Sequence, residues 1–208
     1  MSIGTPPARK RTRRSPEESR ENILAAAEAL LVEKGPQALK LADVAAAAGV
    51  VHATVLHHFG SIDGVQAALM ERMIRQLVDQ ILAMEAPSDD PMARAEAGAT
   101  ALFDAFESRG AARLAAWLEL TGEARRLTTV RAAVDEVVSA RMAAAGLDPA
   151  VARDFILVSV ILAVGVGLFG PSLSELMGQP PGRARELAQA WLKVREAAWL
   201  ARASSPET

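Results

Sequence analysis

Cysteine is absent from this 208-residue chain, so neither a disulfide bond nor thiolate chemistry can contribute to its fold or function. Tyrosine is absent as well, and aromatic residues make up only 4% of the sequence, although half of all residues are apolar. This composition is typical of a helical protein rich in alanine and leucine. The lack of cysteine suits a reducing cytoplasm, and no apolar core follows the N-terminal arginines as it would in a secretory signal. We therefore expect a cytoplasmic protein.

The chain also lacks an apolar run as long as a membrane span requires. Its longest such stretch, residues 155–170, has sixteen residues and is bounded by Asp154 and Pro171. A transmembrane helix needs roughly 18–20 residues. We therefore interpret this stretch as a buried helix and expect no membrane partner.

No part of the sequence alternates apolar and polar residues as a strand would, and helical spacing dominates from residue 15 onward. Ser15, Pro16 and Glu18 predict the start of the first helix through a capping box. We predict an all-α protein of about nine helices, in which a three-helix N-terminal domain precedes a C-terminal helical bundle.

Residues 39–59 predict two short helices joined by a tight turn. Leu41, Val44 and Ala48 recur at helical spacing, and Gly49 ends the first helix because glycine enters a left-handed turn without steric cost. A helix-turn-helix of this length is the motif that places its second helix in the major groove of DNA. The DNA-binding candidates of this motif are Lys40, His52, Ala53, Thr54, Leu56, His57 and His58.

Positive charge is concentrated at the start of the chain. The first fourteen residues hold five basic side chains and no acidic one, and the remainder holds 18 basic and 25 acidic residues. We predict a basic arm that follows DNA phosphates or enters a minor groove, and the alternative is a solvated tail. The basic residues of this arm are Arg9, Lys10, Arg11, Arg13 and Arg14.

From about residue 20 to residue 69 the sequence resembles the DNA-binding region of the tetracycline-repressor (TetR) family of bacterial regulators. The resemblance rests on Ile23-Leu24-x-Ala26-Ala27, Lys34-Gly35, Asp43-Val44-Ala45, Ala48-Gly49-Val50, Thr54-Val55 and His57-His58-Phe59. It implies a basic arm at 1–14, a helix-turn-helix domain at 15–62 and a ligand-binding and dimerisation domain at 63–208. The implied function is that of a transcriptional regulator, a repressor that a small hydrophobic or aromatic effector releases from a palindromic operator.

The sequence departs from the family pattern at Lys40, Val51, Leu56 and Ile62. These departures keep a second interpretation open, in which a regulator-like helical protein acts through protein contacts rather than through specific DNA reading.

The resemblance further implies a small-molecule pocket, which we place among the fifth to seventh predicted helices, residues 92–145. Apolar side chains that face one interior there would suit a hydrophobic effector, and plain core packing is the alternative. The candidate ligand-binding residues are Phe103, Phe106, Trp117, Thr121, Val138 and Met142, and Val134 faces the same interior.

A homodimer interface is expected on the last two helices. Ser159, Ala163 and Gly167 place small residues on one face of the eighth helix, where another helix could approach closely. An apolar stripe on the ninth helix complements them, and packing within one chain is the alternative. That stripe consists of Leu187, Trp191, Val194 and Ala198.

The sequence offers no catalytic constellation. The three histidines at 52, 57 and 58 lack the i, i+4 spacing that places two imidazoles on one helix face. No glycine-rich phosphate loop follows a strand, because no strand is predicted. We therefore expect no enzymatic activity, no metal and no cofactor.

Overall fold

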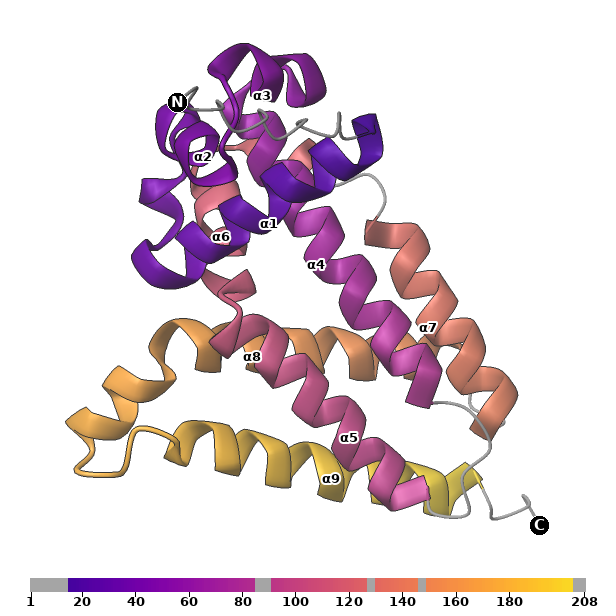
Figure 1. The fold of residues 1–208 in the computed structure, drawn as a ribbon. Coiled ribbons are helices and arrows are strands. Elements are labelled where there is room, and N and C mark those ends of the chain that lie inside the picture. The colour runs from indigo at the N-terminus through magenta and orange to yellow at the C-terminus, as the bar shows by residue number, and fades with distance from the viewer. Residues whose placement is uncertain (1–14, 85–90, 127–129, 146–148, 204–208) are drawn as a thin grey trace, which may run out of the picture.

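A computed structural model describes residues 15–84, 91–126, 130–145 and 149–203 (Figure 1). Every regular element within these ranges is helical, which confirms the all-α prediction. The α-helices are α1 (Pro16–Lys34), α2 (Leu41–Ala48), α3 (His52–Phe59), α4 (Ile62–Met84), α5 (Pro91–Phe103), α6 (Ala111–Leu120), α7 (Val130–Ala145), α8 (Pro149–Leu176) and α9 (Arg183–Ala203). Shorter turns of helix are η1 (Pro36–Ala38), η2 (Asp104–Ser108) and η3 (Glu123–Arg126).

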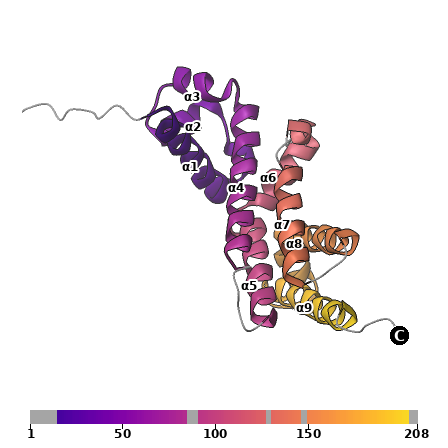
Figure 2. The same cartoon turned by 90° about the vertical axis from the view of Figure 1, so that its right-hand side faces the viewer.

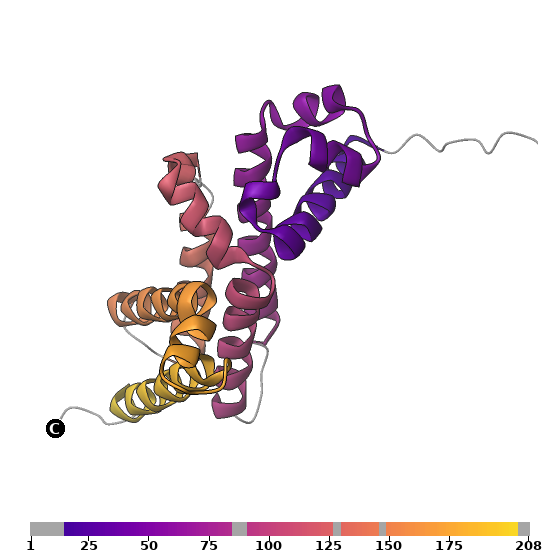
Figure 3. The same ribbon diagram turned by 90° about the vertical axis from the view of Figure 1, so that its left-hand side faces the viewer.

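The long helix α4 connects two groups of helices. Figures 2 and 3 show α1–α3 on one side of its N-terminal half, with α8 and α9 on the opposite side near its C-terminal end. Helices α5, α6 and α7 lie along α4 and between it and the last two helices. A change in the packing around the C-terminal half of α4 can therefore reach α1–α3 through one continuous helix.

Local sequence signals account for the N-terminal helices. The Ser15 hydroxyl accepts a hydrogen bond from the Glu18 amide at 3.1 Å, and the Glu18 carboxylate accepts one from the Ser15 amide at 2.8 Å. This reciprocal pair satisfies two of the amides that a helix start leaves without partners. Gly49 ends α2 at φ 66°, in the left-handed region that glycine enters without steric cost. The predicted start of α1 and the predicted turn of the helix-turn-helix are both confirmed.

One apolar cluster joins α1–α3 to α4, α5, α6, α8 and α9, whereas Ala133 and Val137 of α7 form a smaller cluster with Val78 of α4. Ile23 and Leu31 of α1 and Val44 of α2 are fully buried, in one cluster with Leu69 of α4 and Leu114 of α6. Because this core is continuous, α1–α3 are packed against the rest of the chain rather than tethered to it.

Three stretches depart from a regular, uninterrupted α-helix pattern. Helix α5 ends at Phe103 and continues as the π-helical turn η2, after which the Arg109 amide donates to the Asp104 carbonyl at 3.0 Å. The 3₁₀ turn η3 precedes α7, which starts at Val130. Helix α8 continues through Pro171 to Leu176. Over a single turn, the spacing of apolar residues does not distinguish an α-helix from a 3₁₀-helix or a π-helix, because their numbers of residues per turn are similar.

Helix α8 is apolar on every side, and most of it is not covered by its own chain. By length and composition alone its residues Ala150–Leu176 could cross a membrane, with a mean hydropathy of 2.3 and 22% of the apolar window buried. A single helix of this kind is weak evidence for a span, because a core helix passes the same test. The inner face packs on α6, η2 and α9. The prediction of a buried helix is therefore correct for this face and wrong for the outer one.

Candidate DNA-binding face and ligand cavity

The outward side of α3 carries the side chains expected to face DNA. Val55 is fully buried beneath the helix and anchors it to the core. Thr54 and His58 are partly buried at its edges. The exposed residues on this side are His52, Ala53, Leu56 and His57. They form a continuous patch that mixes imidazole donors with small and apolar groups, as contacts to base edges and thymine methyl groups require.

Two residues of α1 fix the position of this helix pair. The Asn22 side-chain amide donates to the Ala48 carbonyl at the end of α2, at 2.8 Å. The Arg20 guanidinium donates to the His58 carbonyl at 3.1 Å and lies 4.4 Å above the centre of the Phe59 ring. A cation at the C-terminal end of α3 also meets the negative end of the helix dipole.

Neither positioning residue was predicted from the sequence. Arg20 and Asn22 are polar residues of α1, which precedes the predicted helix-turn-helix at residues 39–59. The role of Asn22 could have been predicted from one rule. The last carbonyl groups of a helix have no hydrogen-bond partner within that helix, so a polar side chain of a neighbouring helix is expected to donate to them.

The N-terminal end of α3 has no side-chain cap. Val51 occupies the cap position, makes no capping hydrogen bond and is 68% exposed. The next helix is better fixed, because the Ser61 hydroxyl accepts a hydrogen bond from the Gly64 amide at 3.0 Å. Lys40, at the cap position of α2, is exposed and also makes no capping bond.

An ion-pair network joins α1 to α4 and to the segment after η2. The Glu28 carboxylate accepts hydrogen bonds from Arg109 Nε at 3.0 Å and Arg109 Nη2 at 2.6 Å. Its other oxygen accepts from Arg72, which also donates to Glu21 at 3.1 Å. Arg109 additionally donates to the Gln76 side chain. The Glu28 side chain is only 17% exposed, so these charges interact with less screening by water than a surface pair would.

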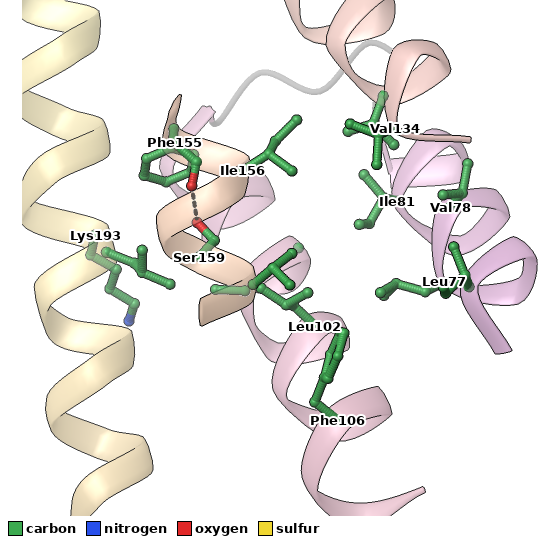
Figure 4. A pocket seen from close by; sticks show the side chains of 16 residues that line it. Leu77, Val78, Ile81, Leu102, Phe106, Val134, Phe155, Ile156, Ser159 and Lys193 are labelled. Carbon is green, nitrogen blue, oxygen red and sulfur yellow. Dashed lines mark hydrogen bonds between the residues drawn. The ribbon is translucent and has the colours of Figure 1, made fainter. Parts of the chain in front are cut away.

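A cavity of about 200 Å³ lies among α4, α5, α7, α8 and α9 (Figure 4). Its walls are apolar except for the side chains of Ser159 and Lys193. The Ser159 hydroxyl donates to the Phe155 carbonyl of its own helix at 2.7 Å, so its proton is already used. The lining residues are Ile74, Leu77, Val78, Ile81, Gly98, Ala99, Leu102, Phe106, Val134, Val137, Phe155, Ile156, Ser159, Val160, Leu192 and Lys193.

The cavity overlaps in part with the predicted region, residues 92–145, and extends beyond it to α4, α8 and α9. Phe106 and Val134 line it as expected. Phe103 and Val138 are buried but do not line the cavity. Trp117, on α6, does not line it either. Thr121 is exposed, and its hydroxyl donates to the Trp117 carbonyl at 2.9 Å. Helical periodicity identifies inward residues but not which of them surround a void. The Met142 side chain lies outside the described part of the chain.

The predicted dimer face is corrected in part. Ser159 is 6% exposed and Ala163 is fully buried within the single chain. A Cβ on Gly167 would lie 2.7 Å from Ala112 Cβ and 2.8 Å from the Phe106 carbonyl oxygen. Gly167 therefore admits α6 and η2 of the same chain, Ser159 lines the cavity, and Ala163 is buried, so these small residues pack within one chain.

The opposite side of α8 and one side of α9 expose a large apolar surface. On α9, the predicted residues Leu187, Trp191 and Val194 are 53%, 48% and 69% exposed, and the Ala198 side chain lies outside the described part of the chain. We call the corresponding surface of α8 its outer face. It consists of Leu157, Ile161, Phe169, Leu173 and Leu176, which are 50–82% exposed.

Two further expectations concern the basic arm and a metal site. The arm residues Arg9, Lys10, Arg11, Arg13 and Arg14 lie outside the described ranges. Within those ranges, no three histidine or acidic side chains come together as metal ligands would.

The described residues thus combine a helix-turn-helix whose second helix is exposed, one long connecting helix and a helical bundle that holds an apolar cavity.

Comparison with known proteins finds similarity in the helix-turn-helix part of the chain. Residues 23–69 match the model of the bacterial regulatory proteins of the tetR family. A 73-residue segment, 35% of this chain, is 38% identical to an HTH-type transcriptional repressor of Mycobacterium tuberculosis, and the match spans 38% of that repressor's length. The helix-turn-helix part of the chain is thus similar to that of the tetR family of bacterial regulatory proteins.

Solved structures share the whole fold. A transcriptional regulator from Rhodococcus sp. Rha1 superimposes with a TM-score of 0.69 at 22% identity, over 91% of this chain and 100% of that chain. A TetR-family regulator from Pectobacterium atrosepticum gives a TM-score of 0.67 at 20% identity, over 95% of this chain and 100% of that chain. At these identities the likeness concerns the fold alone.

Proposed function

We propose that the protein is a cytoplasmic, homodimeric repressor that binds a palindromic operator and leaves it when a small hydrophobic effector enters the cavity. The observation that carries the DNA-binding part is the exposed patch on α3. The buried Val55 holds the helix in place, while His52, Ala53, Leu56 and His57 stay accessible. Imidazole donors and apolar side chains on one helix face suit the edges of bases in a major groove.

The exposed apolar surface of α8 and α9 supports a dimer. Exposed apolar patches larger than a few hundred Å² are rare on monomers and mark interaction sites. A second copy of the chain offers the same surface, so a two-fold contact would bury both at once. Two α3 helices held in this way would read two half-sites of a palindrome.

The position of the cavity supports control by an effector. Four lining residues, Ile74, Leu77, Val78 and Ile81, belong to α4, the helix whose other end packs against α1 and α3. An effector shifts the equilibrium only if it binds one arrangement of α4 more tightly than the other. A ligand that wedges α4 away from α7 would favour a spacing of the recognition helices that does not fit the operator.

The test is binding of the purified protein to fragments of genomic DNA at modest salt, followed by sequencing of the retained fragments. We expect a small set of fragments that share an inverted repeat. The variant His57→Ala should lose this enrichment, whereas Glu33→Ala, a change on an exposed part of α1, should keep it. Retention without any shared sequence would contradict the operator model.

The same experiment tests the second candidate function, a regulator-like protein that acts through protein contacts. It is favoured by apolar groups at the DNA-facing end, since Val51 is 68% and Leu56 is 42% exposed. If this candidate is correct, the wild type and His57→Ala will retain the same fragments.

A further inference from the structure

The cavity that the proposed function assigns to the effector also restricts the chemistry of that effector. Fourteen of its sixteen lining residues carry no polar side-chain atom, and the Ser159 proton is already donated to the Phe155 carbonyl. A polar group buried in such a site without a hydrogen-bond partner costs several kcal/mol. Sugars, nucleotides and other ligands with polar groups on every side are therefore poor occupants, and the buried part of the ligand must be hydrocarbon.

The size of the cavity limits that hydrocarbon part. A dry, aliphatic cavity of about 150 Å³ holds one benzene molecule. The cavity here, at about 200 Å³, accommodates an apolar body of roughly eight carbon atoms on the same scale.

Lys193 is the only charged side chain among the lining residues. Its stem lies along the cavity wall, and Figure 4 shows its nitrogen at the edge of the lined space. The side chain is 37% exposed, as expected of a lysine that buries its methylene groups and keeps its ammonium near water. The ammonium donates to the Glu96 carboxylate at 2.6 Å, and this pair bridges α9 and α5.

The Glu96 partner is replaceable. Its side chain is 59% exposed and does not line the cavity. Exposed ion pairs contribute little to the free energy of folding. A carboxylate that enters from the cavity side can therefore take the place of Glu96 on the ammonium without a large penalty, while Glu96 turns to water.

We propose that the ligand is an amphiphilic monocarboxylate of medium chain length. This proposal rests on the effector site of the proposed function. Its aliphatic tail fills the cavity, and its carboxylate binds Lys193 Nζ in place of Glu96. Lys193 thus selects the head group, and the apolar walls select the tail. The exchange releases the link between α5 and α9 when the ligand binds.

Three probes of equal tail length test this assignment by titration calorimetry of the full-length protein: octanoate, 1-octanol and octylammonium. We expect octanoate to bind about tenfold more tightly than 1-octanol, because a charge-assisted hydrogen bond is roughly twice as strong as a neutral one. Octylammonium should bind most weakly, since its charge repels that of Lys193.

Variants separate the head-group contact from the cavity itself. Lys193→Met and Lys193→Gln should reduce octanoate affinity to that of 1-octanol and leave 1-octanol binding unchanged. Glu96→Gln should tighten octanoate binding by about twofold to fivefold, because the competing carboxylate is removed. Arg183→Met is the matched control: it removes a cation from the same helix outside the cavity lining and should change neither affinity.

The possible failures are distinguishable. If octanoate and 1-octanol bind the wild type equally and the Lys193 variants bind both unchanged, the head-group assignment is overturned while the apolar effector site stands. If none of the three probes binds the folded wild type, the effector site of the proposed function is overturned together with it.

Discussion

At the scale of single residues, the helix-turn-helix depends on side chains that do not face DNA. Asn22 and Arg20 reach from α1 to the backbone at the ends of α2 and α3. Neither bond adds a contact to a base, yet both determine the angle at which α3 leaves the core. The orientation of a recognition helix is therefore partly encoded in the helix that precedes the motif.

Asn22→Leu should destabilise the protein by about 1–2 kcal/mol, because it leaves the Ala48 carbonyl without its hydrogen-bond partner. Urea denaturation of the variant and the wild type measures this difference in the free energy of unfolding. Glu33→Gln, which changes an exposed acid on the same helix, is the control and should shift stability by less than about 0.5 kcal/mol. An Asn22→Leu variant as stable as the control would show that the bond to Ala48 is dispensable.

At the scale of elements, α8 shows how one helix serves two contacts. Its inner face, with Ala163 and Gly167, packs within the chain, and its outer face, with Ile161 and Phe169, is exposed. The sequence of α8 does not reveal which face is the inner one. In most helices a hydrophobic stripe beside polar residues marks the inner face, but here both faces are apolar.

The two faces of α8 should respond differently to substitution. Ile161→Glu, on the outer face, should convert a dimer to a folded monomer, because it buries an unpaired charge in the proposed contact. Gly167→Leu should instead destabilise each chain by about 1–3 kcal/mol, since its side chain would collide with Ala112 and the backbone at Phe106. Sedimentation velocity and thermal unfolding of both variants measure these effects.

Leu120→Glu is the control for Ile161→Glu, since Leu120 is 86% exposed at the end of α6 and lies outside the proposed contact. It should leave the sedimentation coefficient unchanged. A dimer that survives Ile161→Glu would place the contact on another surface.

Sequence reasoning succeeded where a short signal fixes the backbone, and it failed where packing decides. Ser15 and Gly49 specify a helix start and a turn through their own hydrogen bonds and dihedral angles, so both could be predicted. Trp117 and Phe106 are equivalent as apolar residues in the sequence, and only the arrangement of α4, α7 and α9 makes Phe106 a wall of the cavity. The small residues at 159–167 allow another helix to pack closely, but the sequence does not indicate whether that helix belongs to the same chain or to a partner chain.

At the scale of the whole molecule, charge is distributed unevenly. Residues 15–62 contain three basic residues, Arg20, Lys34 and Lys40, against six acidic ones. Of these cations, Arg20 lies against Phe59 and Lys34 is 3.7 Å from Glu33, which leaves Lys40 as an exposed cation without a capping bond. A DNA-binding face with so few cations attracts phosphate weakly, so the five cations of residues 1–14 become important.

Deleting residues 2–14 should weaken binding to specific and random DNA alike, and it should flatten the salt dependence. For every phosphate that the truncated protein no longer neutralises, the slope of log K against log salt should become shallower by about 0.9. Site preference should survive, because base contacts stay with α3. The measurement is operator affinity across a salt series for the full-length and truncated proteins.

A length-matched control replaces the five arm cations, Arg9, Lys10, Arg11, Arg13 and Arg14, by glutamine. It should reproduce the effect of the deletion if charge is the cause. Equal slopes for all three proteins would identify the arm as a solvated tail.

The ion-pair network at Glu28 has a consequence for protein engineering. Consider a chimera in which residues 1–62 come from another protein and residues 63–208 from this one. Here the donor segment would replace Glu28 but retain Arg72 and Arg109 from the recipient. Two partly buried guanidinium groups would then face each other without their shared acid, which is strongly destabilising. Only donors with a carboxylate at this place on their first helix are compatible, so position 28 defines which natural domains this scaffold can accept.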